Sequence, residues 1–280
     1  MITYSKISDT NNFVLQQRSN GKTIGFVPTM GALHDGHLEL MKRAKQENDI
    51  LIVSVFVNPT QFNNKQDLDK YPRDVNRDKR LLIDVGCDVL FAPTADEMYP
   101  NKVTKKYDFG SLGSVMEGGS RPGHFNGVAI VVNKLLDITN PHKAYFGEKD
   151  YQQLAIIKKL VEMESLPVQI IDCPIVREKD GLAMSSRNER LTSDERNTAP
   201  YIHQILKLAK KNSSTVCPRK LKQMVINIFK AEDEFELEYF ELADDKELQP
   251  ITSWDSASGI IAFIVVRLGK VRLIDNIRII

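Results

Sequence analysis

Short apolar runs alternate with amphipathic stretches along the chain between Thr23 and Cys173. Apolar runs bounded by polar or glycine-containing segments are typical of buried strands, and apolar residues that recur every three or four positions are typical of helices. The expected strands are Thr23–Val27, Ile50–Val57, Val89–Phe91, Ala144–Phe146 and Val168–Asp172. The expected helices are Leu38–Gln46, Asn76–Val85, Gly127–Leu136 and Tyr151–Met163.

This alternation predicts an α/β fold. Strands that are apolar along their length, such as Ile50–Val57, fit a parallel sheet covered by helices on both faces. We therefore expect a Rossmann-like, doubly wound parallel sheet, in which ligands bind beyond the carboxyl ends of the strands. Pro28, Asn58 and Gly147 each follow an expected strand, so the polar segments that begin there should meet at one edge of the sheet.

The pattern changes near residue 176. Helices are expected over Glu195–Lys211 and Pro218–Ala231, then a half-exposed strand at Phe235–Tyr239 and a hairpin of Gly259–Val266 with Val271–Ile274. This order indicates a second, smaller α+β domain. The predicted domains are residues 1–175 and 176–280, and the glycine-rich segment Gly110–Gly123 is predicted as a loop.

The segment with the most specific chemistry is P-T-M-G-A-L-H-D-G-H, residues 28–37. It places His34 and His37 three residues apart at the expected start of a helix, where both can face one ligand. A helix N-terminus adds N–H donors and the positive end of a dipole, which favours a nucleotide phosphate. A half-built zinc site and purely structural histidines are the alternatives, and no cysteine lies nearby.

Composition excludes several classes of protein. The net charge of +1 over 280 residues argues against nucleic-acid binding, which needs a basic surface. The longest apolar run, Ile260–Val266, is too short to span a membrane, and the polar start of the chain does not resemble a signal peptide. The three cysteines form no C-x-x-C pair. We therefore expect a cytoplasmic protein with no nucleic-acid or membrane partner.

Four further polar segments fall at the expected functional edge: Asn58–Phe62, Arg121–Phe125, Phe146–Gln153 and Met184–Asn188. Amide side chains can bind hydroxyl and carboxylate groups, and a lysine at a helix start favours a bound anion. Two hydroxyls beside a guanidinium can bind phosphate oxygens. Taken one at a time, each segment could also be an ordinary turn with a solvated side chain.

Together these segments resemble the pantothenate synthetase (pantoate–β-alanine ligase) family. The motifs P-T-M-G-A-L-H-D-G-H, V-N-P-T-Q-F, R-P-G-H-F-N-G-V, F-G-E-K-D-Y-Q-Q and M-S-S-R-N occur in the order typical of that family, across about residues 20–190. The histidine motif is also similar to the wider nucleotidyltransferase and class I aminoacyl-tRNA synthetase superfamily. There the M-S-S-R-type loop commonly carries lysines, whereas here Ala183, Ser186 and Arg187 stand at those positions.

The resemblance implies that ATP and Mg²⁺ are used to join pantoate to β-alanine through a pantoyl-adenylate, in a homodimer. It implies that charge on the phosphates is stabilised by His34, His37, Lys149, Ser185, Ser186 and Arg187, with His37 as the family's proton donor. Mg²⁺ would bind mainly through phosphate oxygens and water, so its protein ligands stay unassigned.

The resemblance also implies three sets of binding residues. The ATP site comprises Met30, Gly31, Ala32, Leu33, His34, Asp35, Gly36, His37, Gly147, Glu148, Lys149, Asp150, Val176, Met184, Ser185, Ser186 and Arg187. The pantoate site comprises Gln61, Gln153, Pro28, Met30 and Phe56. The β-alanine site comprises Gln61, Arg121 and His124.

Two other functions remain open at this point. One is a nucleotidyltransferase of the same fold that releases a nucleotidyl product, which the amide pair Gln61 and Gln153 disfavours. The other is a non-catalytic nucleotide-binding module, which the presence of both histidines and Lys149 disfavours. A fragment of an RNA-dependent synthetase is disfavoured by the near-zero net charge.

Overall fold

The computed structural model describes residues 1–61 and 74–280, and the chain forms two compact units. Unit 1 consists of Met1–Phe109, Arg121–Glu148 and Ile156–Pro174. Unit 2 consists of Gly110–Ser120, Lys149–Ala155 and Ile175–Ile280. Unit 2 thus includes two short segments that precede the predicted division at residues 175/176.

Unit 1 is built on a six-stranded sheet with the order β1-β4-β3-β2-β5-β6, and every described pairing is parallel. Its strands are β1 (Ile2–Tyr4), β2 (Ile24–Thr29), β3 (Ile50–Val55), β4 (Val89–Phe91), β5 (Lys143–Gly147) and β6 (Gln169–Cys173). From β2 the chain adds strands in one direction, and β5 then starts the other direction. This switch point is where doubly wound sheets bind ligands. β2 pairs with β5 only at Gly25 and Phe26, near the start of β2.

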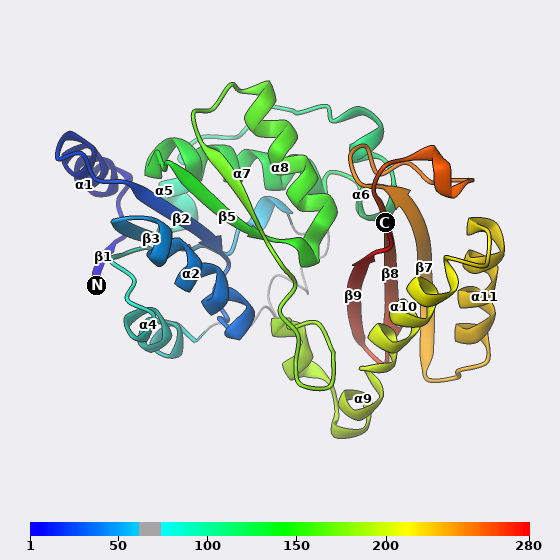
Figure 1. The fold of residues 1–280 in the computed structure, drawn as a ribbon. Coiled ribbons are helices and arrows are strands. Elements are labelled where there is room, and N and C mark those ends of the chain that lie inside the picture. Colours follow the sequence, from blue (N-terminus) through cyan, green and yellow to red (C-terminus); the bar gives the residue numbers. More distant parts are fainter. Residues whose placement is uncertain (62–73) are drawn as a thin grey trace. The chain divides into compact units, whose positions relative to one another are not determined.

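Helices cover both faces of this sheet (Figure 1). They are α1 (Ile7–Ser19), α2 (Asp35–Glu47), α4 (Val75–Asp84), α5 (Ala95–Met98) and α7 (His124–Thr139), with α8 (Tyr151–Met163) between β5 and β6. Met41 and Ala44 of α2 and Leu82 of α4 pack against apolar strand residues such as Val27 and Val53. This close packing fixes where α2 begins relative to the end of β2.

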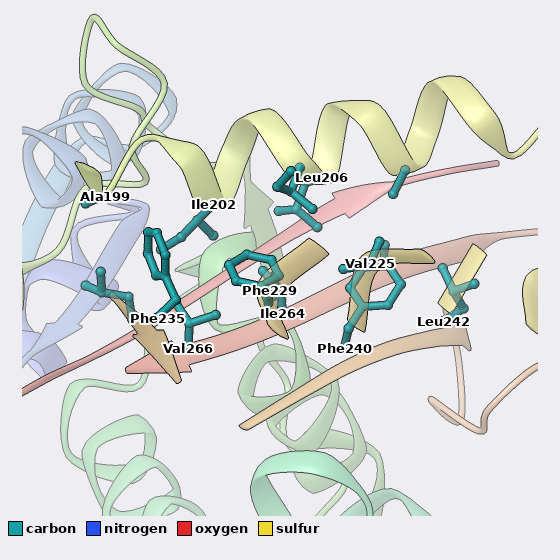
Figure 2. Close-up of a cluster of buried hydrophobic side chains, with 14 of the residues drawn as sticks. Ala199, Ile202, Leu206, Val225, Phe229, Phe235, Phe240, Leu242, Ile264 and Val266 are labelled. Carbon is teal, nitrogen blue, oxygen red and sulfur yellow. The ribbon is translucent and has the colours of Figure 1, made fainter. Parts of the chain in front are cut away.

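Unit 2 contains a three-stranded antiparallel sheet of β7 (Phe235–Asp244), β8 (Ile260–Leu268) and β9 (Val271–Arg278), covered by α10 (Tyr201–Asn212) and α11 (Pro218–Lys230). Ile202 and Phe229 of these helices and Phe240 and Ile264 of the strands belong to one buried cluster (Figure 2). The sheet and its helices therefore share a hydrophobic core of their own.

The structure confirms the predicted α/β class and the smaller α+β part, with differences in particular elements. The expected helix Glu195–Lys211 is interrupted into α9 (Ser193–Thr198) and α10, because Pro200 lacks the N–H that a continuous helix needs. The segment predicted as a glycine-rich loop contains short helical turns, η2 (Gly110–Gly113) and α6 (Met116–Ser120). Strand β1 and helix α1 were not expected. None of the helices in the described residues has the length and apolar character needed to cross a membrane.

Candidate active site

The turn between β2 and α2 has a conformation set by its side-chain partners. Gly31 has a φ of +80° and Ala32 a φ of +50°, both in the left-handed region. The hydroxyl of Thr29 accepts a hydrogen bond from the backbone N–H of Gly31 at 3.2 Å and donates to the carbonyl of Ser54 at 2.8 Å. Left-handed backbone at Ala32 costs on the order of 1 kcal/mol and persists only where neighbouring groups hold it.

Asp78 of α4 supplies that restraint. Its carboxylate accepts from the N–H of Ala32 at 3.0 Å and of Leu33 at 2.8 Å, and its exposed fraction is 3%. A Cβ at Gly31 would lie 2.9 Å from Oδ2 of Asp78, so only glycine fits there beside the carboxylate. Sequence reasoning missed Asp78. The available signal was its position four residues before Leu82, which places it on the buried face of the helix.

His34 and His37 lie together at the start of α2, as their spacing predicted. His34 is the N-cap residue, and the two rings have centroids 4.0 Å apart with an interplanar angle of 34°. The backbone N–H of His34 donates to Nδ1 of His37 across a long 3.4 Å contact. A nitrogen that accepts a hydrogen bond carries no proton, so this contact favours the tautomer in which Nε2 of His37 bears the hydrogen and can donate.

Gln61 lies in the 3-10 turn η1 (Pro59–Gln61), after β3. Its Nε2 contacts the sulfur of Met30 at 2.9 Å, and its Oε1 accepts from Nδ2 of Asn58 at 3.2 Å. Oδ1 of Asn58 accepts from the hydroxyl of Tyr99 at 2.9 Å, and Asn58 is only 1% exposed. Asn58 thus orients the predicted substrate ligand Gln61. Phe62, which ends the predicted segment Asn58–Phe62, lies outside the described residues.

His124 and Arg121 join the same cluster. Nδ1 of His124 lies 2.9 Å from the carbonyl oxygen of Gln61, and Nε2 lies 3.1 Å from a guanidinium nitrogen of Arg121. A carbonyl only accepts and a guanidinium only donates, so Nδ1 carries the hydrogen and Nε2 accepts. The ring of His124 therefore links Arg121 to the backbone of Gln61, with one hydrogen bond at each nitrogen. His124 is also the first residue of α7, not part of the preceding turn.

A cavity of about 440 Å³ lies beside this cluster in unit 1. Met30, Phe56, Val55, Leu90 and Pro93 give it a mostly apolar lining, and Asp74 and Asp78 add carboxylates. Met30 and Phe56 are two of the residues that the family resemblance assigns to the pantoate site. The remaining lining residues are Gly31, Val57, Pro59, Val75, Ala92 and Ala95.

The predicted residues Gly147 and Glu148 end a segment of unit 1, whereas the predicted residues from Lys149 onward belong to unit 2. Lys149 lies in the 3-10 turn η3 (Glu148–Asp150) that follows β5, and its side chain is 17% exposed, with the ammonium 3.8 Å from a carboxylate oxygen of Asp150. Gln153 lies in the first turn of α8 and is half-buried. Its neighbour Gln152 is buried and bonds to Leu112, Val115 and Glu117, so it fastens the glycine-rich segment.

The predicted hydroxyl and guanidinium loop forms the 3-10 turn η4 (Ser186–Arg190), with Ser185 as its N-cap residue. Oγ of Ser185 accepts from the N–H of Arg187 at 3.2 Å, which leaves its hydroxyl hydrogen to donate elsewhere. The N–H of Met184 donates to the carbonyl of Val176 at 3.0 Å. This bond joins the two ends of the segment that precedes the turn.

Comparison with known proteins decides the family. A family model described as pantoate-beta-alanine ligase matches residues 2–278. The chain belongs to this family. A pantothenate synthetase from Porphyromonas gingivalis is 48% identical over 278 residues, covering 99% of both chains. A pantothenate synthetase structure from Thermus thermophilus superposes with a TM-score of 0.93 at 38% identity, covering 100% of this chain and 99% of that one.

A pantoate–β-alanine ligase from Francisella tularensis, solved in complex with beta-gamma ATP and β-alanine, is also similar. It is 39% identical with a TM-score of 0.82, and the match covers 99% of this chain and 97% of that one. The segments that carried the resemblance to the pantoate–β-alanine ligase family therefore belong to a full-length match of sequence and fold. Within residues 1–61 and 74–280, no group of three or more His, Cys, Asp or Glu side chains could hold a metal ion.

Proposed function

We propose that this chain condenses pantoate with β-alanine at the expense of ATP and releases pantothenate, AMP and pyrophosphate. A carboxylate oxygen of pantoate attacks the α-phosphorus of ATP, and the bond to the pyrophosphate leaving group breaks. The amine of β-alanine then attacks the acyl carbon of the pantoyl-adenylate, loses a proton, and AMP leaves. No covalent enzyme intermediate is needed, so the chain has to align reactants and stabilise phosphate charge.

The observation that carries this proposal is the close pair of rings of His34 and His37, with centroids 4.0 Å apart, at the switch point of the sheet. The restrained turn before α2 holds both rings at one helix start, where an anion is favoured. In the tautomer described above, Nε2 of His37 donates a hydrogen bond to the phosphates as charge shifts toward pyrophosphate.

Gln61 and Met30 belong to the proposed pantoate site, with Pro28 and Phe56. The cavity lined by Met30 and Phe56 supports an apolar wall for the geminal methyl groups, while Gln61 has an amide oxygen and an amide nitrogen for the hydroxyls and carboxylate. Gln153 completes this set. Arg121 is the cation proposed for the β-alanine carboxylate, and His124 holds Arg121 beside Gln61.

Lys149, Ser185, Ser186 and Arg187 are proposed to stabilise charge on the phosphates. A guanidinium, an ammonium and two hydroxyls together form the kind of donor set that stabilises a polyphosphate. Met30–His37 and Gly147–Asp150 are proposed to contact ATP, as are Val176 and Met184.

We further propose that Mg²⁺ arrives with ATP, that the protein is a homodimer, and that it works in the cytoplasm. The described residues contain no cluster suited to a resident metal ion, so no step is assigned to one. Hard cations of this size are commonly held by phosphate oxygens and water.

Exchange of labelled pyrophosphate into ATP tests the proposal. We expect exchange that requires pantoate and proceeds without β-alanine, because the first step is reversible and precedes amine binding. Absence of exchange from protein with an intact circular dichroism spectrum would falsify the adenylate mechanism. A stable nucleotidyl product released in place of AMP would indicate the alternative nucleotidyltransferase.

A further inference from the structure

We infer that Asp275 and Asn276 of β9 are positioning residues that hold two phosphate-binding segments of unit 2 in one arrangement. The inference deepens the proposed function and rests on it, since it concerns how Lys149 and the Ser185–Arg187 turn are oriented. Neither residue belongs to a motif that pointed to the site.

Asn276 fixes the backbone from which the Lys149 side chain extends. Its Nδ2 donates to the carbonyl oxygen of Lys149 at 3.0 Å, and its exposed fraction is 5%. Lys149 lies in the short 3-10 turn between β5 and α8, and the hydrogen bonds of a 3-10 turn have poorer geometry than those of an α-helix. A buried bond from a neighbouring sheet strand therefore sets the point from which the ammonium reaches a phosphate.

Asp275 fixes the segment that leads into the Ser185–Arg187 turn. Its two carboxylate oxygens accept from two guanidinium nitrogens of Arg177, at 2.7 and 3.0 Å, and it is 5% exposed. Arg177 also donates to the carbonyl of Gly181 at 3.1 Å and pairs with Ala183 in an isolated antiparallel bridge. The two ends of the segment from Arg177 to Ala183 are thus paired with each other. The ion pair of Arg177 with Asp275 attaches this segment to β9 just before the turn begins.

The two anchors are coupled because they are adjacent and share partners. Arg177 also donates to the carbonyl of Asn276 at 3.2 Å, and the N–H of Asn276 donates to a carboxylate oxygen of Asp275 at 2.7 Å. A shift at one residue therefore moves the other. On the same strand, Arg272 forms a bidentate ion pair with Glu117 of the glycine-rich segment. Side chains of β9 therefore anchor a third segment as well.

Small displacements of positioned groups can cost as much as about 100-fold in rate. A purely structural role predicts lower stability without a specific link to Lys149. A positioning role predicts that the loss caused by an Asn276 substitution depends on the presence of the Lys149 side chain. A double-mutant cycle separates these two cases.

The experiment measures pantoate-dependent pyrophosphate exchange for Asn276→Ala, Lys149→Ala and the double variant, at a temperature where thermal melts show each to be folded. We expect Asn276→Ala to lose about 10-fold alone and less than about 2-fold in the Lys149→Ala background. Equal losses in both backgrounds would overturn the positioning role, as would a Lys149→Ala variant with unchanged exchange.

A second experiment tests the role of Asp275, and it also tests the inference if Asn276→Ala is too unstable to assay. Asp275→Asn is matched with Glu241→Gln. The carboxylate of Glu241 on β7 pairs with the ammonium of Lys222 on α11 at 2.6 Å, and neither is a proposed site residue. We expect Asp275→Asn to weaken ATP binding, measured by calorimetry, by about 5-fold or more, and Glu241→Gln to leave it unchanged. Equal affinity in both variants would contradict the inference. Because ATP binding needs no turnover, this result is independent of whether the wild-type protein shows pyrophosphate exchange.

Discussion

The carboxylate of Asp78 lies 2.8 Å from the backbone nitrogen of Leu33, across 45 residues of sequence. Together with the bond to Ala32, this contact makes one buried side chain of α4 responsible for the shape of the turn that begins α2. The two histidines follow that turn directly. The geometry of the proposed phosphate site therefore depends on a residue to which the proposed mechanism assigns no chemical step.

We predict that Asp78→Asn lowers both stability and activity. An amide has one acceptor oxygen, so one of the two backbone N–H groups loses its buried partner, which costs about 1–3 kcal/mol. Pyrophosphate exchange should fall at least about 10-fold, because the turn that carries the histidines relaxes. Urea unfolding and exchange assays measure the two effects.

Asp88 offers a matched control within unit 1. Its carboxylate accepts from the backbone N–H of Leu51 and pairs with Lys45, both at 2.7 Å, near the amino end of β3. Asp88→Asn should lower stability and leave the exchange rate of the folded protein unchanged. A comparable loss of exchange in both variants would show that stability alone accounts for the Asp78 effect.

We predict that His37→Ala reduces turnover at least about 100-fold, the usual cost of removing one donor to developing charge. The matched control is His142, whose Nδ1 accepts from the backbone N–H of Ile24 at 2.9 Å and which has no proposed role in the reaction. His142→Ala should retain turnover. Steady-state assays of both variants are sufficient, and unchanged turnover in His37→Ala would remove it from the mechanism.

Gln153→Ala should raise the KM for pantoate much more than the KM for ATP. The adjacent Gln152 provides the contrast, since it holds the carbonyls of Leu112 and Val115 and is buried. Gln152→Ala should therefore lower the melting temperature, whereas Gln153→Ala should leave it nearly unchanged. Equal rises in both KM values for Gln153→Ala would contradict its assignment to pantoate.

Gly127→Ala should displace Gln61. A Cβ at Gly127 would lie 2.4 Å from the carbonyl oxygen of Thr60 and 2.9 Å from Cα of Gln61, so the 3-10 turn must move. We expect a higher KM for pantoate together with lower stability. Gly25→Ala is the control, because its Cβ would lie 2.6 Å from Nδ2 of Asn48. It should destabilise the protein without changing that KM.

Glu47 should contribute a pH-dependent part of stability. Hydrogen bonds from Arg43 at 2.8 Å and Lys143 at 2.9 Å hold the pKa of this carboxyl at about 2, below its ordinary value of 4.5. A carboxyl whose pKa is depressed on folding stabilises the protein above its unfolded pKa, and that stabilisation is lost as pH falls toward the folded pKa. The side chain is 30% exposed, so solvent screening limits the effect to about 1 kcal/mol.

Urea unfolding of wild type and Glu47→Gln from pH 7 to pH 3 measures this contribution. The difference in unfolding free energy should be constant from pH 7 to about pH 5 and should shrink below that, because the wild-type carboxyl becomes protonated on unfolding. A difference that does not change with pH would show that the charge of Glu47 makes no contribution.

Local patterns were sufficient to predict much of the fold and part of the site. Continuous apolar runs located β3 and β4, and the spacing of His34 and His37 located the start of α2. Helix α1 was missed because Thr10 and Val14 are its only buried residues, so it shows almost no hydrophobic periodicity.

Residues that act through contacts distant in sequence could not be found in this way. Asp78 meets its partners 45 and 46 positions away, and Asn276 meets Lys149 across 127 positions. The placement of the glycine-rich segment in unit 2 depends likewise on Gln152, more than 30 residues further along the chain. The spacing of apolar residues indicates which face of a helix or strand is buried. It does not indicate which polar groups form hydrogen bonds with each other.

The close approach of Asp78 to Gly31 also limits how this sequence can diverge. Any side chain at position 31 would meet Oδ2 of Asp78 at 2.9 Å, and loss of the carboxylate would release the left-handed turn that position 31 helps to form. Single substitutions at either position are therefore each unfavourable, and replacing both still leaves a left-handed turn without its acceptor. The two residues are expected to be inherited as a pair.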